Sequence, residues 1–90
     1  MLSNTHTGKL LTVRDIMSVL SVGRTKLYTR ITDGTLPPLL KLGVTSVLPD
    51  HEVEAIRRAV IAGYDDEQQR KLVKQLVAAR ETIEVLPSAA

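Results

Sequence analysis

Residues 11–34 read LTVRDIMSVLSVGRTKLYTRITDG, and this stretch decides the fold because it holds the start and stop signals of two short helices. Thr12 is placed to cap the first helix, with Asp15 three residues later as its capping-box partner. A Ser-Val-Gly sequence then ends that helix, and Gly34 ends a second helix that begins at Arg24. The stretch therefore predicts two helices joined by a tight turn.

The second of these helices is cationic and has no carboxylate along most of its length. Leu27 and Ile31 are four residues apart and are expected on its buried face, with Tyr28 at the edge of the core. A helix-turn-helix with such a second helix is typical of small proteins that place it in the major groove of DNA. Solvation of an exposed helix face is the alternative reading of the same cations. The residues expected to contact DNA from this helix are Arg24, Thr25, Lys26, Thr29 and Arg30.

The segment after Gly34 predicts a small β-hairpin and two further helices. Two apolar runs, 39–42 and 45–48, flank Gly43-Val44 and indicate the hairpin. A third helix is expected from Asp50, its predicted cap, to the stop signal at Gly63. A fourth helix begins at the acidic residues 65–67 and runs to about Leu86. Outside the second helix, the residues expected to contact phosphates are Lys9, Arg14, Lys41 and Thr45, and Tyr28 joins them through its hydroxyl.

Length and composition fit one small globular domain. The chain has 90 residues, is 43% hydrophobic, and contains two Tyr but no Phe, Trp or Cys, so its core must be aliphatic and no disulfide or cysteine-based zinc site is possible. The net charge of +2 is distributed unevenly. Residues 1–49 hold six Lys or Arg against two Asp or Glu, whereas the remainder holds six against eight. A basic front half indicates that one surface meets a polyanion.

The fourth helix carries a short heptad pattern. Its members are spaced four, three, four and three residues apart, which gives about two repeats. Pairing with a second copy of the chain and packing back on the domain's own core both fit this pattern, and a homodimer contact is favoured because three helices already complete a core. The predicted dimerisation residues are Leu72, Leu76, Ala79, Ile83 and Leu86. Earlier, in the third helix, Arg57 and Arg58 are expected to pair with Glu52 or Glu54.

Residues 11–63 resemble the AlpA-like and excisionase branch of the MerR-type winged-helix DNA-binding domains. The likeness lies in five pieces that occur in the family's order and near its spacing: LLTVRDI at 10–16, VGRTKLY at 22–28, DGTLP at 33–37, KLG at 41–43 and EVEAI at 52–56. Such domains often carry aromatic residues where this chain has Val47-Leu48 and Ile56, and Ser or Thr where it has Gly23. These departures imply a repacked core and a slightly weaker cap on the second helix.

The resemblance implies a winged helix-turn-helix, to which the fourth helix looks like an addition. The expected fold is therefore mostly α with a small β-hairpin and a long C-terminal helix. Residues 1–9 are expected to form a flexible tail, 10–63 the DNA-binding domain, and 64–90 the C-terminal helix with its dimerisation contact. The second helix would enter the major groove of double-stranded DNA, and the hairpin would reach the neighbouring minor groove or backbone. Small members of the family include phage excisionases, which bind and bend attachment-site DNA and direct an integrase toward excision of a viral genome without performing chemistry.

The first functional hypothesis is accordingly a phage or prophage excisionase, a recombination directionality factor located in the bacterial cytoplasm at the nucleoid. A transcriptional regulator on the same fold is the second hypothesis, and a protein-interaction module working through the heptad helix is the third. No enzyme, metal or cofactor site is expected, because His6 and His51 lie apart from any nucleophile or ligand cluster and the glycines stand singly. No apolar run is long enough for a membrane span or a signal peptide.

Overall fold

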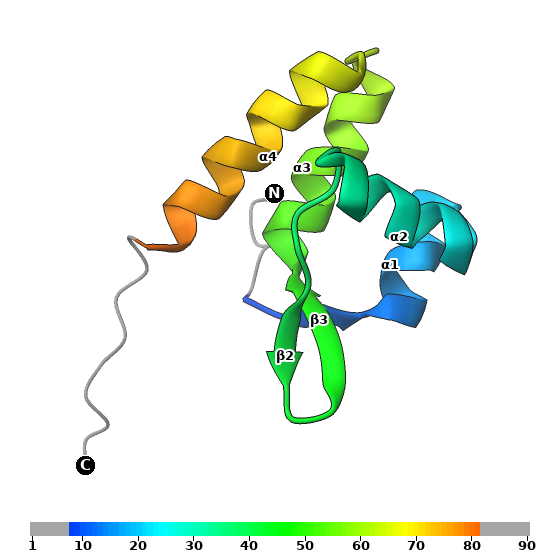
Figure 1. Ribbon diagram of the computed structural model, residues 1–90, viewed down its shortest axis with the longest axis vertical. Helices are drawn as coiled ribbons and strands as arrows, with labels where there is room; N and C mark the ends of the chain where they lie inside the picture. The colour runs from blue at the N-terminus through cyan, green and yellow to red at the C-terminus, as the bar shows by residue number, and fades with distance from the viewer. Residues whose placement is uncertain (1–7, 82–90) are drawn as a thin grey trace.

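The computed structural model describes residues 8–81, so most of the expected tail, together with Ile83 and Leu86, lies outside the described residues. Within them four helices gather at one end of a small antiparallel sheet, and the β2–β3 hairpin projects away from them (Figure 1). The elements in chain order are β1 (Leu10–Thr12), α1 (Val13–Leu20), α2 (Arg24–Asp33), β2 (Leu40–Leu42), β3 (Thr45–Pro49), α3 (Asp50–Ile61) and α4 (Asp66–Arg80). The predicted helical class with a hairpin is confirmed.

Helix ends follow the local signals closely. The Thr12 side chain accepts from the Asp15 amide and the Asp15 carboxylate accepts from the Thr12 amide, which completes the predicted capping box. Gly34 ends α2 with a φ of 85°, a left-handed backbone conformation that favours glycine. A second capping box forms between Asp65 and Gln68 at the start of α4.

The predicted cap of α3 is wrong by one residue. Pro49 is the N-cap, with extended backbone angles, and Asp50 is the first residue of the helix. The reason lies in the sheet: β3 continues through Pro49, and the Asp50 amide donates to the Lys9 carbonyl at 2.9 Å. This hydrogen bond holds the chain extended up to Pro49, the last residue before the helix. The carbonyl of Pro49 is therefore the first one that can accept a hydrogen bond within α3.

A third strand, β1, was not predicted. It pairs antiparallel with β3, so that the strand order is β1-β3-β2 and Leu11 lies opposite Leu48. Residues 10–12 carry no alternating pattern long enough to distinguish a strand from the lead-in to a helix. Their strand conformation comes from partners almost 40 residues later in the chain, which local pattern does not reveal. The hairpin of β2 and β3 lies where it was predicted.

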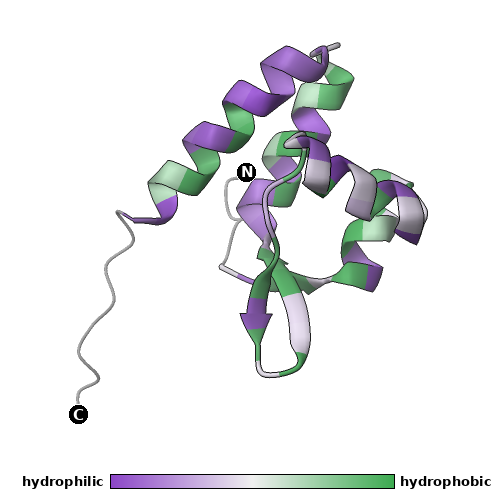
Figure 2. Ribbon diagram, in the orientation of Figure 1, coloured by the Kyte–Doolittle hydropathy of each residue, from purple (hydrophilic) through white to green (hydrophobic). Residues whose placement is uncertain are grey.

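The core is aliphatic, as the composition predicts. The buried cluster joins α1, α2, β3, α3 and α4 and consists of Ile16, Leu27, Leu36, Leu48, Val53, Ile56 and Val73. Val47, Leu48 and Ile56 are all less than 5% exposed. Leu48 and Ile56 pack in the same buried cluster as Leu27 of α2. Figure 2 shows hydrophobic and hydrophilic residues alternating along the ribbons of α3 and α4.

α4 packs back on the domain. Val73 is 6% exposed, and Leu72, Leu76 and Val77 pack against the same core cluster. Two of the predicted dimerisation residues thus contact their own chain, whereas Ala79 is exposed. In the described part of the chain, none of the helices combines the length and apolar character that a bilayer crossing requires.

Candidate nucleic-acid interface

The outer face of α2 is open and polar. Arg24, Thr25, Tyr28 and Thr29 are exposed, and together with Thr32 and the acidic Asp33 at the end of the helix they line a shallow depression. These positions follow one another at the spacing of a helix face. Three of the predicted recognition residues, Arg24, Thr25 and Thr29, therefore lie side by side on one surface. Tyr28, which we expected at the core edge, is 43% exposed between them.

Packing on the opposite side makes this face rigid. Leu27 is completely buried and Ile31 packs against the core, so the helix cannot rotate without exposing them. Val22 in the preceding turn also packs against the core. Gly23 caps α2 without a side-chain hydrogen bond, as the absence of Ser or Thr there predicts, so amides of the first turn remain available to an anion.

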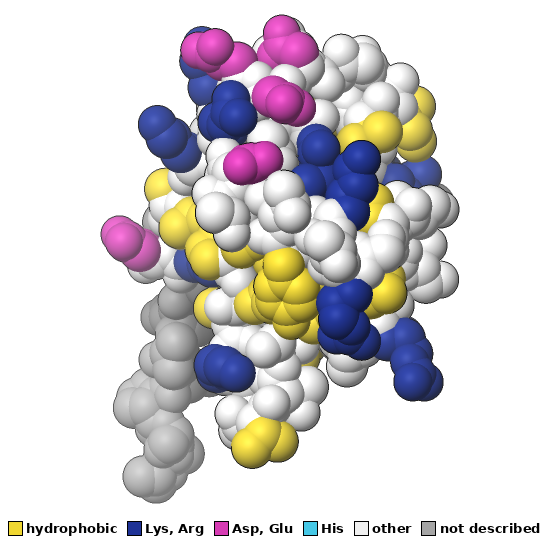
Figure 3. Space-filling view, turned by 45° about the vertical axis from the view of Figure 1, so that its right-hand side comes forward, with side chains coloured by type: hydrophobic (Ala, Val, Ile, Leu, Met, Phe, Trp, Pro, Cys, Tyr) yellow, Lys and Arg dark blue, Asp and Glu magenta, His cyan; other side chains and the backbone are white. Residues whose placement is uncertain are grey.

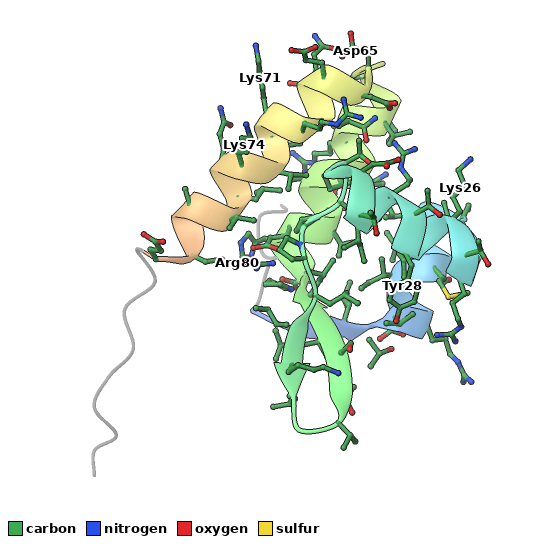
Figure 4. The ribbon with its side chains drawn as sticks, in the orientation of Figure 1. Lys26, Tyr28, Asp65, Lys71, Lys74 and Arg80 are labelled. Atoms are coloured by element: carbon green, nitrogen blue, oxygen red, sulfur yellow. The ribbon has the colours of Figure 1, made fainter. Side chains whose placement is uncertain are left out.

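Lys26 and Arg30 lie on a different flank of α2. They are four residues apart and line a cavity toward α1, α3 and the start of α4. The Arg30 guanidinium donates to Gln69 Oε1 at 3.0 Å and lies 3.8 Å from Asp66 Oδ1, with 27% of its side chain exposed. The structure thus does not bring Arg30 onto the face of Arg24. In Figure 4, Lys26 and Tyr28 point away from α2 in different directions.

The β2–β3 hairpin carries its two predicted phosphate contacts on opposite faces. Lys41 lies opposite Ser46 and Leu42 opposite Thr45, and neighbouring residues of a strand point to opposite sides. Lys41 and Thr45 are both exposed. The most exposed apolar residue of the described chain is Val44, at 96%, in the hairpin turn, where Figure 3 shows apolar surface at the lower tip of the molecule.

The remaining predicted phosphate contacts, Lys9 and Arg14, are exposed just before β1 and in the first turn of α1. Within residues 8–81, the side chains that form no ion pair and no hydrogen bond include Lys9, Arg14, Arg24, Lys26 and Lys41. In Figure 3 Lys and Arg side chains, without acidic ones, occupy the lower right of the view, whereas acidic side chains gather at its upper end, where α4 begins. One side of the molecule therefore offers uncompensated positive charge.

Three arginines of α3 and α4, Arg57, Arg58 and Arg80, are instead paired with carboxylates of the same chain, whereas Lys71 and Lys74 form no ion pair in the described residues. Glu54 pairs with Arg57 at 2.6 Å and with Arg58 at 3.0 Å, which confirms one of the two expected pairings. Hydrogen bonds from Arg57, and then from Arg58, lower the pKa of the Glu54 carboxyl from 4.5 to about 2. The same contact with Glu54 raises the pKa of Arg57.

Glu52, the other expected partner, pairs elsewhere. Its side chain is fully buried, and both of its oxygens accept from Arg80 of α4, at 2.6 and 2.8 Å. Arg80 also donates to the Pro38 carbonyl, and Arg70 donates to the Asp33 carbonyl. These contacts fasten α4 to the segment that follows α2. The sequence does not predict the Glu52–Arg80 pair, because 28 residues separate its two members. The only indication in the sequence is that Glu52 lies among apolar positions of its helix that are expected to be buried.

Comparisons with protein-family models, with curated proteins and with solved structures find no match to this chain. The described residues contain no group of three or more His, Asp or Glu side chains arranged to hold a metal ion.

Proposed function

We propose that the protein is a sequence-specific binder of double-stranded DNA with a winged helix-turn-helix architecture. In this proposal α1 and α2 form the helix-turn-helix and the β2–β3 hairpin is the wing. The observation that carries the proposal is the exposed outer face of α2, on which Arg24, Thr25 and Thr29 lie together without an acidic neighbour in the first two turns. A B-DNA major groove about 12 Å wide admits one α-helix.

The polar groups of this face match the chemistry of base edges. The Arg24 guanidinium can donate two hydrogen bonds to guanine O6 and N7, and the Thr25 and Thr29 hydroxyls can donate or accept. Arg24 and Thr25 belong to the first turn, which is the part of a recognition helix that reaches deepest into the groove. Specificity is therefore assigned to Arg24, Thr25 and Thr29.

The surrounding cations serve as phosphate anchors. Lys9, Arg14 and Lys41 are exposed and have no acidic partner in the described part of the chain, so their charge is free to displace counterions from DNA. The β2–β3 hairpin projects from the helical part of the molecule (Figure 1), and as the wing it would place Lys41 against the adjoining DNA backbone. Arg30, held by Gln69, is assigned to fixing α2 against α4 rather than to reading bases.

We infer that the biological role is that of an excisionase, because residues 11–63 resemble that branch of the winged-helix family. A protein of this kind bends attachment-site DNA and directs an integrase toward excision, and no catalytic group of its own is needed. A transcriptional regulator would use the same surface.

A homodimer through α4 stays a prediction, which sedimentation equilibrium of the full chain would test.

The test begins with selection of bound duplexes from a random-sequence pool, followed by fluorescence anisotropy on the selected site. We expect a salt-sensitive complex with the selected duplex and a weaker one with scrambled DNA. The excision assay then combines the protein with a candidate integrase and with the attachment-site DNA of that integrase. Recombination that proceeds equally well with and without the protein would refute the excisionase role and leave the regulator.

A further inference from the structure

A cavity of about 360 Å³ opens on the flank of α2 that faces α1 and α3. Its floor is deeply buried: Leu36, Ile56 and Gln69 are 1%, 2% and 5% exposed. Its other aliphatic lining residues include Leu20 and Val22. The lining is therefore mostly aliphatic and suits an apolar side chain that enters from outside.

The rim of the cavity is an apolar collar. Val19 at the end of α1 is 40% exposed, and Val60 and Ile61 at the end of α3 are 55% and 71% exposed. A ligand that filled only the cavity would leave this collar in water. A polypeptide segment that inserted one side chain and covered the collar would bury all of it, so the extent of the apolar surface favours a protein partner over a small molecule.

The charge around the opening is positive. Lys26, Arg30 and Arg57 line it, and no Asp or Glu does. Arg30 lies beside Asp66, and Arg57 shares the single carboxylate of Glu54 with Arg58. Lys26 has no ion pair in the described chain. An excess of positive charge therefore remains, and the complementary partner carries carboxylates beside its apolar side chains.

We propose that this cavity and its collar form a docking site for an acidic amphipathic helix of a partner protein. The partner inserts a leucine-sized side chain over Leu36 and Ile56, covers Val60 and Ile61, and directs a carboxylate to Lys26. The site goes beyond the proposed DNA contact. Because successive helix residues turn by about 100°, the flank of Lys26 and Arg30 is separate from that of Thr25 and Thr29.

The experiment titrates the full-length, isotope-labelled protein with a synthetic peptide of about 15 residues, long enough to form a helix on binding, with leucine along one face and glutamate along the other. Amide shifts are expected to change at the end of α1, around Lys26 and in the last turn of α3. Replacing the glutamates of the peptide by lysine should weaken binding about tenfold or more. Octanoate, a small apolar anion, is titrated separately.

The matched variants are Ile61→Ser on the collar and Lys71→Glu on α4, both at exposed positions that leave the core intact. Lys71 points away from the domain in Figure 4. Ile61→Ser should weaken the peptide about tenfold, given its lost apolar contact, and leave DNA affinity unchanged. Lys71→Glu should change neither by more than about twofold, a difference of about 0.4 kcal/mol.

The proposal is overturned if the acidic peptide shifts none of these amides, or if the acidic and basic peptides bind equally. Saturation by octanoate without any response to the peptide would instead make the cavity a small-molecule site. Shifts of the same amides on raising the protein concentration alone, again without a peptide response, would make the surface a contact between two copies of the chain.

Discussion

Arg24 and Arg30 belong to the same helix, but their neighbouring side chains give them different roles. Arg24 is exposed and has no acidic partner in the described chain, so its guanidinium can bind a ligand without first breaking a contact. Arg30 donates to Gln69, whose own amide donates to the Tyr64 carbonyl. Removing Arg30 from this network would leave the buried Gln69 oxygen without its donor. The sequence places both arginines on α2 but does not distinguish these roles.

Arg24→Ala should weaken binding to the selected DNA site by about 1–3 kcal/mol and reduce the preference for that site over scrambled DNA, because a bidentate contact to guanine is lost. Lys41→Ala should weaken binding to both duplexes by the same factor, because a phosphate contact carries no sequence information. Fluorescence anisotropy of the two variants on both duplexes measures this. Equal losses on specific and scrambled DNA for Arg24→Ala would reverse its assignment as a reader.

The pH dependence of stability should carry a contribution from Glu54. Its pKa is lowered from 4.5 to about 2 in the folded chain, so the stabilisation is complete above pH 4.5 and is lost as the pH falls toward 2. Because Arg57 and Arg58 are 43% and 70% exposed, solvent screening limits this contribution to about 1 kcal/mol or less. Glu54→Gln should therefore unfold at lower denaturant concentration than the parent at pH 6, and the gap should narrow as the pH falls toward 2. A gap at pH 2 as large as the gap at pH 6 would contradict the ion pair as its cause.

At the scale of elements, capping interactions between residues close in sequence determine several helix ends. Contacts between residues far apart in sequence determine strand β1 and the attachment of α4. The boundaries set by Thr12, Gly34 and Asp65 were predictable because capping is a local interaction. Strand β1 was not, because its partner is far along the chain. The buried Glu52–Arg80 pair was not either, since both residues read as ordinary surface charges of their own helices.

The turn between α1 and α2 contains a residue under strain. Ser21 has a φ of 56°, the left-handed conformation, while its amide donates to the Met17 carbonyl. Ser21→Gly should raise the free energy of unfolding by about 0.5–1 kcal/mol, because glycine adopts this conformation without a steric cost. Chemical denaturation measures the change, with Ser18→Gly, at an exposed position inside α1, as a control that should destabilise. Destabilisation by Ser21→Gly would show that the strain is absent.

The attachment of α4 depends on the Glu52–Arg80 pair. Arg80→Ala leaves a carboxylate that is fully buried without its cationic partner, so it should lower the free energy of unfolding by about 3–5 kcal/mol. Glu52→Leu combined with Arg80→Met removes both charges and should recover most of that loss. Denaturant titration of the single and double variants tests the coupling. If the double variant is as unstable as Arg80→Ala, the unpaired charge is not the cause.

At the scale of the whole molecule, one face presents free cations and another a cavity, and the Glu52–Arg80 pair fastens α4 to α3. The aliphatic core and the positions of Arg24, Thr25 and Thr29 on one surface follow from helical periodicity, which is why the sequence could predict them. The separation of Lys26 and Arg30 onto the cavity flank depends on how α3 and α4 pack, and no local pattern contains that information.

DNA affinity measured against salt concentration tests the central claim most directly. Fluorescence anisotropy with the selected duplex should give a straight line of log affinity against log salt, and Lys41→Ala should reduce its slope by about 1, because one fewer counterion is released. Absence of a complex with every duplex tried at low ionic strength would contradict the account.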